Sequence, residues 1–85
     1  MQEDIIIVTL ETDGFYGDFG LPSNVVLGEL YPRLLAVLQK ASSRIFGDWK
    51  TLILATSEGA LLDKNATLFD YGICTGYYLS VAQEE

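Results

Sequence analysis

The chain has 85 residues, enough for one small domain in which nearly every large apolar side chain of a regular element is needed for the core. Hydrophobic residues make up 49% of the chain and charged residues 20%, which argues against a disordered segment. The net charge is −7 and the five basic residues are scattered, so we expect no nucleic-acid binding, which requires clustered Lys and Arg.

The first predicted elements are two strands joined by a tight turn. Residues 5–10 are rich in β-branched side chains, and Asp13-Gly14 supplies the positive φ that a hairpin turn needs. Residues 15–21 then alternate loosely between larger and smaller side chains, and Pro22 closes the run. These features predict an antiparallel hairpin.

One amphipathic helix is predicted from Leu27 to about Ala41. We place its start late, near Leu27 or Gly28, so that Pro32 falls within or just past the turn whose N–H groups lack partners. Residues 42–48 form the exit loop, with a possible last turn over 41–45. The apolar residues recur at spacings of three and four and form one wide stripe: Leu27, Leu30, Tyr31, Leu34, Leu35, Val37 and Leu38.

Three further strands are predicted after the helix, at residues 49–56, 61–62 and 77–82. A turn at 57–60 and a polar loop at 63–67 separate them, and residues 68–73 form a brief helical turn that ends at Gly72. The sequence therefore predicts an α+β fold over residues 1–85 as a single domain. It has a mixed sheet of about five strands with the main helix packed on one face.

Two segments carry a resemblance to known families. Residues 66–73 resemble the Thr-Leu-x-Asp-Tyr-x-Ile turn that precedes the last strand of ubiquitin. The chain also resembles the YukD-like family of bacterial type VII secretion systems and the ubiquitin-like cytoplasmic domain of the multi-spanning membrane component of those systems. Residues 22–35, with a proline inside the first helical turns, look like the helix entry of that membrane component. Further positions match the spacing of this family: Trp49, Leu62, Asp63, Leu68, Gly72, Ile73, Gly76 and Leu79.

The resemblance implies a ubiquitin-like β-grasp fold and a non-catalytic, cytoplasmic adaptor that binds a membrane component of the secretion machine. YukD-like chains commonly carry Gly-Asp before the last strand, whereas Gly76 is followed here by Tyr77-Tyr78, which implies a modified surface. The alternatives are an interaction domain of an unrelated assembly and a conjugated or sulfur-carrier modifier. The last residues, 82–85, lack the Gly-Gly that conjugation needs, so we expect no conjugation. The sequence leaves the oligomeric state open.

Enzymatic, cofactor and metal chemistry are not expected from the residue types present. The chain has no histidine, which removes His-based general base catalysis and most zinc sites. Residues 63–67 begin like a calcium loop, but Leu68 and Cys74 stand where glycine and a bidentate glutamate are required. Cys74 has no basic neighbour in sequence that would activate its thiol, so we interpret it as a quiet turn residue.

The cellular location follows from the absence of long apolar runs. The runs Ile5–Val8 and Leu34–Leu38 are far shorter than the roughly 20 residues of a membrane-spanning helix. We expect neither direct membrane insertion nor a signal peptide. A single cysteine cannot form an internal disulfide, which agrees with a reducing compartment. The prediction is a cytoplasmic protein whose acidity suits a basic partner surface.

The remaining functional prediction is a protein-binding surface on the face of the sheet that the helix leaves open. Alternation along the last strands places Ile53, Tyr78 and Ala82 outward, opposite the core-facing leucines. Ile53 and Ala82 align with the open-face patch of ubiquitin, and Tyr78 enlarges it with an aromatic side chain of the kind that anchors interfaces. The alternative is that Ile53 and Tyr78 occur there only because β-branched and aromatic residues favour strands. Trp49 either caps the core beside the helix exit or extends the patch.

Overall fold

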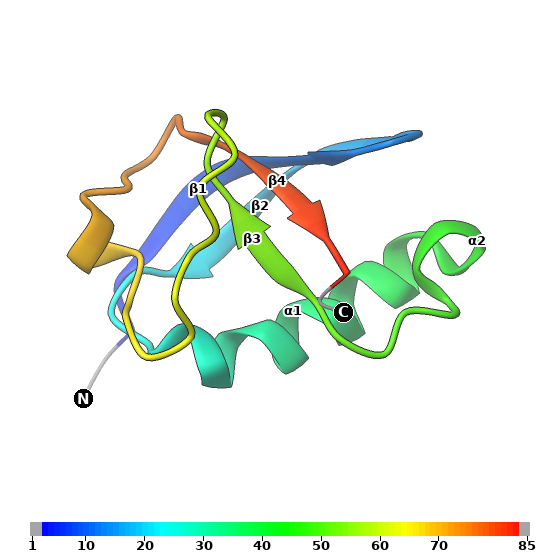
Figure 1. Cartoon of the computed structure of the whole chain (residues 1–85), viewed down its shortest axis with the longest axis horizontal. Helices are drawn as coiled ribbons and strands as arrows, with labels where there is room; N and C mark the ends of the chain where they lie inside the picture. The colour runs from blue at the N-terminus through cyan, green and yellow to red at the C-terminus, as the bar shows by residue number, and fades with distance from the viewer. Residues whose placement is uncertain (1–2, 84–85) are drawn as a thin grey trace.

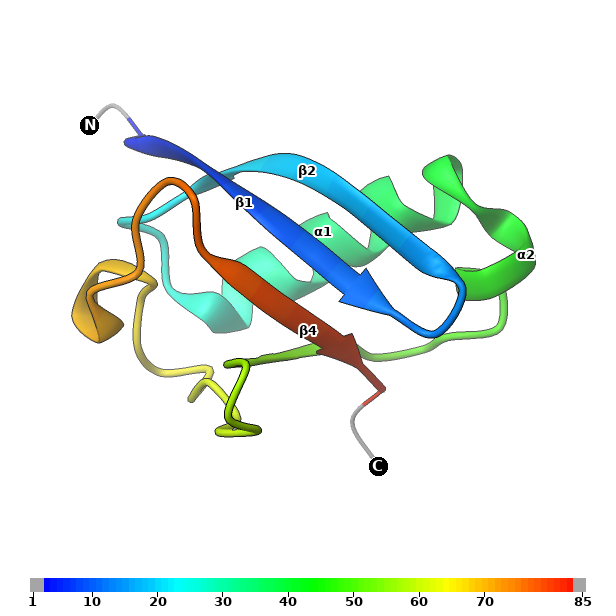
Figure 2. The same cartoon turned by 90° about the horizontal axis from the view of Figure 1, so that it is seen from above.

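The computed structural model describes residues 3–83 and consists of one mixed sheet with a helix lying across one of its faces (Figures 1 and 2). The strand order is β2-β1-β4-β3, with β4 parallel to β1 and antiparallel to β3. The elements in chain order are β1 (Ile5–Thr12), β2 (Phe15–Pro22), α1 (Leu27–Ala41), α2 (Ser43–Phe46), β3 (Ile53–Ala55), the 3-10 turn η1 (Phe69–Tyr71) and β4 (Tyr78–Ala82). The α+β fold class is confirmed.

The hairpin of β1 and β2 has the register that the Asp-Gly turn predicts. Thr12 pairs with Phe15 across the two-residue turn, and Ile5 pairs with Pro22 at the other end. Gly14 has a φ of 78°, a left-handed conformation that a residue with a Cβ adopts only at a cost. The turn residue therefore fixes which side chains of the two strands share a face.

The sheet has four strands, whereas the sequence predicted about five, because two predicted strands are shortened. Only residues 53–55 of the predicted strand 49–56 pair in the sheet, and Leu61 forms only an isolated bridge with Ala55. Two carbonyls of these segments accept hydrogen bonds from side chains of α1, although the Leu62 N–H still donates to the Leu54 carbonyl at 2.9 Å. The Gln39 amide donates to the carbonyl of Trp49 at 3.1 Å, and the Tyr31 hydroxyl donates to the carbonyl of Leu62 at 2.8 Å.

Helix α1 begins and ends where the apolar stripe predicts, and all of the stripe except Val37 is buried. Val37 lies at the edge of the stripe and is 49% exposed, so the buried part of the stripe is narrower than the apolar pattern predicts. No side chain caps the start of the helix. Instead, the N–H groups of Leu27 and Gly28 donate to the carbonyls of Ala66 and Lys64, each at 2.8 Å, so the polar loop supplies the missing cap.

The end of the core beside the hairpin turn is built from three aromatic rings. Phe46 of α2 is fully buried, with its ring centroid 5.0 Å from that of Phe15 and 4.8 Å from that of Trp49, both edge to face. The predicted last turn after the main helix is thus a separate short helix, which carries Phe46 under the hairpin. Burial of this ring ties β2, α2 and the segment before β3 together.

The helical turn before β4 forms as predicted. The Thr67 N–H donates to the Asp70 carboxylate at 3.0 Å, and the Asp70 N–H donates to the Thr67 hydroxyl at 3.1 Å, a reciprocal pair of the capping-box type. Gly72 ends the turn with a φ of 71°. The residues Glu84 and Glu85, on which the prediction against conjugation partly rests, lie outside the described range.

Candidate functional site

Helix α1 covers one face of the sheet and leaves the other face open. Figure 2 looks onto this open face, with α1 behind the strands. The strand register sets which residues meet there, because directly paired residues point to the same side of a sheet. Thr9 of β1 pairs with Asp18 on one side and Tyr78 on the other, and Glu11 pairs with Tyr16 and with Ser80.

Three of the four predicted binding residues lie on the open face. Ile53 and Ala82 are direct partners across β3 and β4, and both are partly buried. Tyr78 lies four residues before Ala82 on the same face of β4 and is 52% exposed. Ile53 sits on an edge strand, where its side chain also packs against the core. The predicted residues are therefore brought together along two neighbouring strands.

Trp49 is the exception among the predicted residues. It precedes β3 and stacks edge to face on the buried Phe46, outside the paired positions of β3 and β4. Its side chain is partly buried against the core cluster. Of the two roles considered for it, this geometry corresponds to capping the core beside the helix exit.

The open face also contains residues that the sequence analysis did not select. Tyr16 is 65% exposed, and a hydrogen bond with Tyr78 raises its pKa above the ordinary value. The Thr9 hydroxyl donates to the Asp18 carboxylate at 2.6 Å, from β1 to the neighbouring β2. Ile7 is an exposed side chain on the same face of β1. The hairpin register contains the signal for them, since it places Tyr16 opposite Glu11.

The charge on the open face is negative. Glu11 and Asp18 are its ionisable acidic residues on the hairpin strands, and the paired positions of the four described strands contribute no Lys or Arg to this face. A hollow of about 670 Å³ beside the hairpin turn is lined by Glu11, Asp13, Tyr16 and Ser80. Exposed apolar and aromatic groups among carboxylates suit a partner with an apolar centre and a basic rim.

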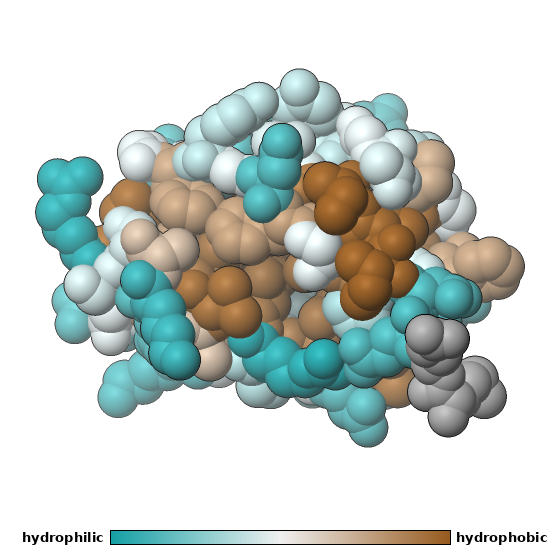
Figure 3. Space-filling view, turned by 180° about the vertical axis from the view of Figure 1, so that it is seen from behind, coloured by the Kyte–Doolittle hydropathy of each residue, from teal (hydrophilic) through white to brown (hydrophobic). Residues whose placement is uncertain are grey.

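A second apolar region lies at the edge of β2. Figure 3 views the molecule from behind and shows brown side chains gathered over β2 and α1 on that side. A hollow of about 110 Å³ there is lined by residues of both elements, including Phe19, Pro22, Leu30 and Val37. This hollow is small and Phe19 is the only aromatic residue in its lining, whereas the open face has two exposed tyrosines, Tyr16 and Tyr78.

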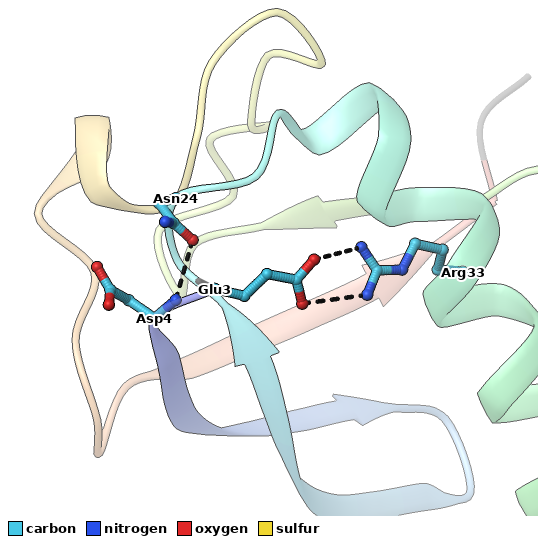
Figure 4. A network of polar contacts seen from close by, with 4 residues as sticks. All are labelled: Glu3, Asp4, Asn24 and Arg33. Atoms are coloured by element: carbon cyan, nitrogen blue, oxygen red, sulfur yellow. Dashed lines mark hydrogen bonds and ion pairs between the residues drawn. The ribbon is translucent and has the colours of Figure 1, made fainter. Parts of the chain in front are cut away.

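Two polar contacts hold the segment before β1 against α1 and the loop that precedes it. The Arg33 guanidinium of α1 makes a two-pronged pair with the Glu3 carboxylate, at 3.1 and 3.3 Å, and the Asp4 N–H donates to Asn24 at 3.1 Å (Figure 4). The hydrogen bond with Glu3 raises the pKa of Arg33 further above its ordinary value. Within residues 3–83, no group of three metal-ligating side chains comes together, and Cys74 is a free, exposed thiol.

The sheet order and the single covering helix define the chain as a ubiquitin-like β-grasp domain. Its family follows from the sequence profile described as "WXG100 protein secretion system (Wss), protein YukD", which matches residues 5–81. The chain belongs to this YukD family. Among curated proteins, no sequence matches it significantly.

Solved structures with the same fold include domains of type VII secretion proteins. The ubiquitin-like domain of the Mycobacterium tuberculosis protein EccD1 is 20% identical with a TM-score of 0.78, and the match covers 94% of this chain and 99% of that one. The EccD5 ubiquitin-like domain from Mycobacterium xenopi is 15% identical with a TM-score of 0.81, covering 96% and 97%. A chain of the ESX-3 core complex is 27% identical with a TM-score of 0.67, covering 96% of this chain and 16% of that one.

Among the helices formed by residues 3–83, none has the length and apolar character needed to cross a bilayer.

Proposed function

We propose that this chain is a non-catalytic protein-binding module of a type VII secretion machine, which docks on a membrane component through the open face of its sheet. The observation that carries the proposal is the open face itself, where Tyr16 and Tyr78 are exposed side by side over a buried Thr9. Family membership supports the link to secretion. A chain of the ESX-5 inner membrane complex has the same fold, with 18% identity and a TM-score of 0.77 over 94% of this chain and 21% of that one, and supports a partner at the membrane.

The chemistry of the face indicates what the partner surface contains. Tyrosine rings bury large areas at little entropic cost and are frequent interface anchors, so Tyr78 and Tyr16 would form the centre of the contact. Ile53 and Ala82 extend the apolar area toward β3, and Glu11 and Asp18 would meet Lys or Arg at its rim. We assign the module to the cytoplasm, recruited to the inner face of the membrane by this contact.

A crosslinked pull-down from the native host tests the proposal. Tagged wild-type chain is compared with the double variant Ile53→Asp, Tyr78→Asp, and with Phe69→Asp as a control. Phe69 is an equally large apolar side chain, 74% exposed, but it lies in η1 outside the sheet. Circular dichroism and thermal unfolding establish that all three chains are folded.

The expected result is recovery of secretion-membrane components by wild type and by the Phe69 variant, with at least a tenfold loss in the double variant, because two charges would be buried at the contact. Equal recovery by the double variant would remove the open face as the docking site. Recovery of proteins of an unrelated assembly by all three chains would remove the secretion assignment and leave a ubiquitin-like interaction domain.

A further inference from the structure

A groove on the helix side of the molecule has the opposite charge from the open face. It has a volume of about 280 Å³ and lies between α1 and the segment that leads into β3. We call it the lysine groove, and its principal lining residues are Tyr31, Pro32, Leu35, Lys50, Leu52 and Lys64. None of these residues belongs to the open face, so the two surfaces can be occupied independently.

The charge of the lysine groove is unusual for this chain. The net charge is −7 and there are only five basic residues, yet two of them, Lys50 and Lys64, line this one groove. No Asp or Glu is among its lining residues. By contrast, Arg33 is already paired with Glu3. Within the described part of the chain, the only ion pair is that of Arg33, so both lysines are available to an external carboxylate.

The floor between the two lysines is apolar. Tyr31, Pro32 and Leu35 of α1 form one wall, and Leu52 contributes to the other. A volume of about 280 Å³ is close to the lower end of small-ligand pockets, which suits one or two large apolar side chains rather than a whole cofactor. An adjoining hollow of about 220 Å³ shares Tyr31 and Lys64, but it is also lined by Asp63, which would repel an acidic segment, so the proposed contact is confined to the first groove.

Backbone contacts hold the two lysine-bearing segments in place. The Gly28 N–H donates to the Lys64 carbonyl at 2.8 Å, and a Cβ at Gly28 would lie only 3.1 Å from that oxygen. The glycine thus permits the close approach of the Lys64 loop to the helix. On the other side, Gln39 donates to the carbonyls of Phe46 and Trp49, which fixes the chain just before Lys50. Walls fixed in this way lower the ordering cost of binding.

We propose that the lysine groove binds a linear acidic segment of a partner protein, with a large apolar side chain on the groove floor and carboxylates on Lys50 and Lys64. Charge complementarity selects this occupant, because the groove is a basic site on an acidic protein. The proposal goes beyond docking through the open face and does not rest on it. Together, the two surfaces allow the chain to hold two partners at once.

The test uses a phage-displayed library of random linear peptides panned against the full chain. Enriched peptides are synthesised, and their affinities are measured for three chains. These are the wild type, the double variant with Lys50→Glu and Lys64→Glu, and the double variant with Lys40→Glu and Arg44→Glu. The last variant has the same change in net charge, but neither of its positions lines the groove. Ala36→Glu, at an exposed helix position lining the groove, adds a variant that blocks the floor without removing a lysine.

We expect the enriched peptides to combine Asp or Glu with a large apolar residue. Their affinity should fall about tenfold or more in Lys50→Glu, Lys64→Glu, stay within about twofold in the control, and weaken with added salt. Three results would overturn the proposal: no enrichment, enriched peptides without acidic residues, or equal binding by the groove variant.

The double open-face variant separates this proposal from the function proposed above. Ile53→Asp, Tyr78→Asp should bind the enriched peptides as wild type does, because neither position is among the principal lining residues of the lysine groove. Peptide binding that is lost in this variant but retained in Lys50→Glu, Lys64→Glu would place the contact on the open face and refute the groove.

Discussion

Replacing Phe46 with alanine should remove roughly a quarter or more of the stability of this domain. The side chain is fully buried, and its ring contacts those of Phe15 and Trp49 at centroid distances of 5.0 and 4.8 Å. Truncating a buried phenylalanine costs roughly 3–5 kcal/mol through lost burial and the cavity that remains. For a domain of this length, a typical total stability is about 4–13 kcal/mol. The variant should therefore melt roughly 12–40 °C below wild type.

The assay is urea unfolding followed by far-ultraviolet circular dichroism, because the fluorescence of Trp49 changes with the mutation itself. The unfolding slope should stay constant while the midpoint falls. Phe69→Ala is the matched control, since this phenylalanine is exposed and its loss should change stability by no more than about 0.5 kcal/mol. A loss below about 1.5 kcal/mol for Phe46→Ala, or equal losses for both variants, would refute the packing argument.

A double-mutant cycle isolates the ring contact from burial in general. Phe46→Leu and Trp49→Leu are measured singly and together, so that burial is largely retained. Edge-to-face aromatic pairs contribute roughly 0.5–1.5 kcal/mol beyond area, and the coupling energy should fall in that range. A coupling energy near zero would mean that Trp49 stabilises the core only through buried apolar area and not through ring geometry.

Three smaller changes test other parts of the structure. Tyr31→Phe deprives the buried Leu62 carbonyl of a donor and should cost about 1–2 kcal/mol in urea unfolding; an unchanged midpoint would contradict the role of that bond. Gly72→Ala should cost about 1–2 kcal/mol, from the positive φ alone because no atom lies within 4 Å of the new Cβ, and a neutral result would contradict the left-handed cap. Tyr78→Phe should lower the pKa of Tyr16, followed by an NMR titration of its ring. The hydrogen bond favours the neutral form of Tyr16. The contribution of this bond to stability is therefore complete below about pH 10 and is lost as the pH rises through the pKa of Tyr16 in the folded chain. An unchanged Tyr16 titration would mean that the two hydroxyls do not interact.

The hairpin and helix α1 could be predicted from the sequence because the residues that determine them are close together in the chain. The Asp13-Gly14 turn fixed the hairpin, and an apolar stripe with spacings of three and four fixed both ends of α1. Residues 49–52 and 61–62 were misassigned for a different reason. Their side chains favour strands, but the carbonyls of Trp49 and Leu62 accept hydrogen bonds from Gln39 and Tyr31 of the helix, and such long-range side-chain donors leave no mark on local periodicity.

For the two candidate surfaces, too, some residues could be predicted from the local sequence pattern and others could not. Alternation along the last strand predicted the outward position of Tyr78, which the register confirms. Tyr16 was missed because its place beside Tyr78 depends on two registers at once, those of β2 with β1 and of β1 with β4. Lys50 and Lys64 are separated along the chain by β3 and a turn, so only the folded chain reveals that they share a groove.

The pairing of β1 with β4 has a consequence for how the chain folds. The Ile7 N–H donates to the Thr75 hydroxyl, a contact that spans 68 residues of the chain. Contacts this distant in sequence require closing a very long loop before they stabilise anything, which slows folding toward milliseconds to seconds. During synthesis, the hairpin and α1 leave the ribosome with the centre of the sheet vacant. Until the last strand arrives, the edges of β1 and β3 are exposed together, so this is the interval in which the nascent chain is most open to aggregation and to chaperones.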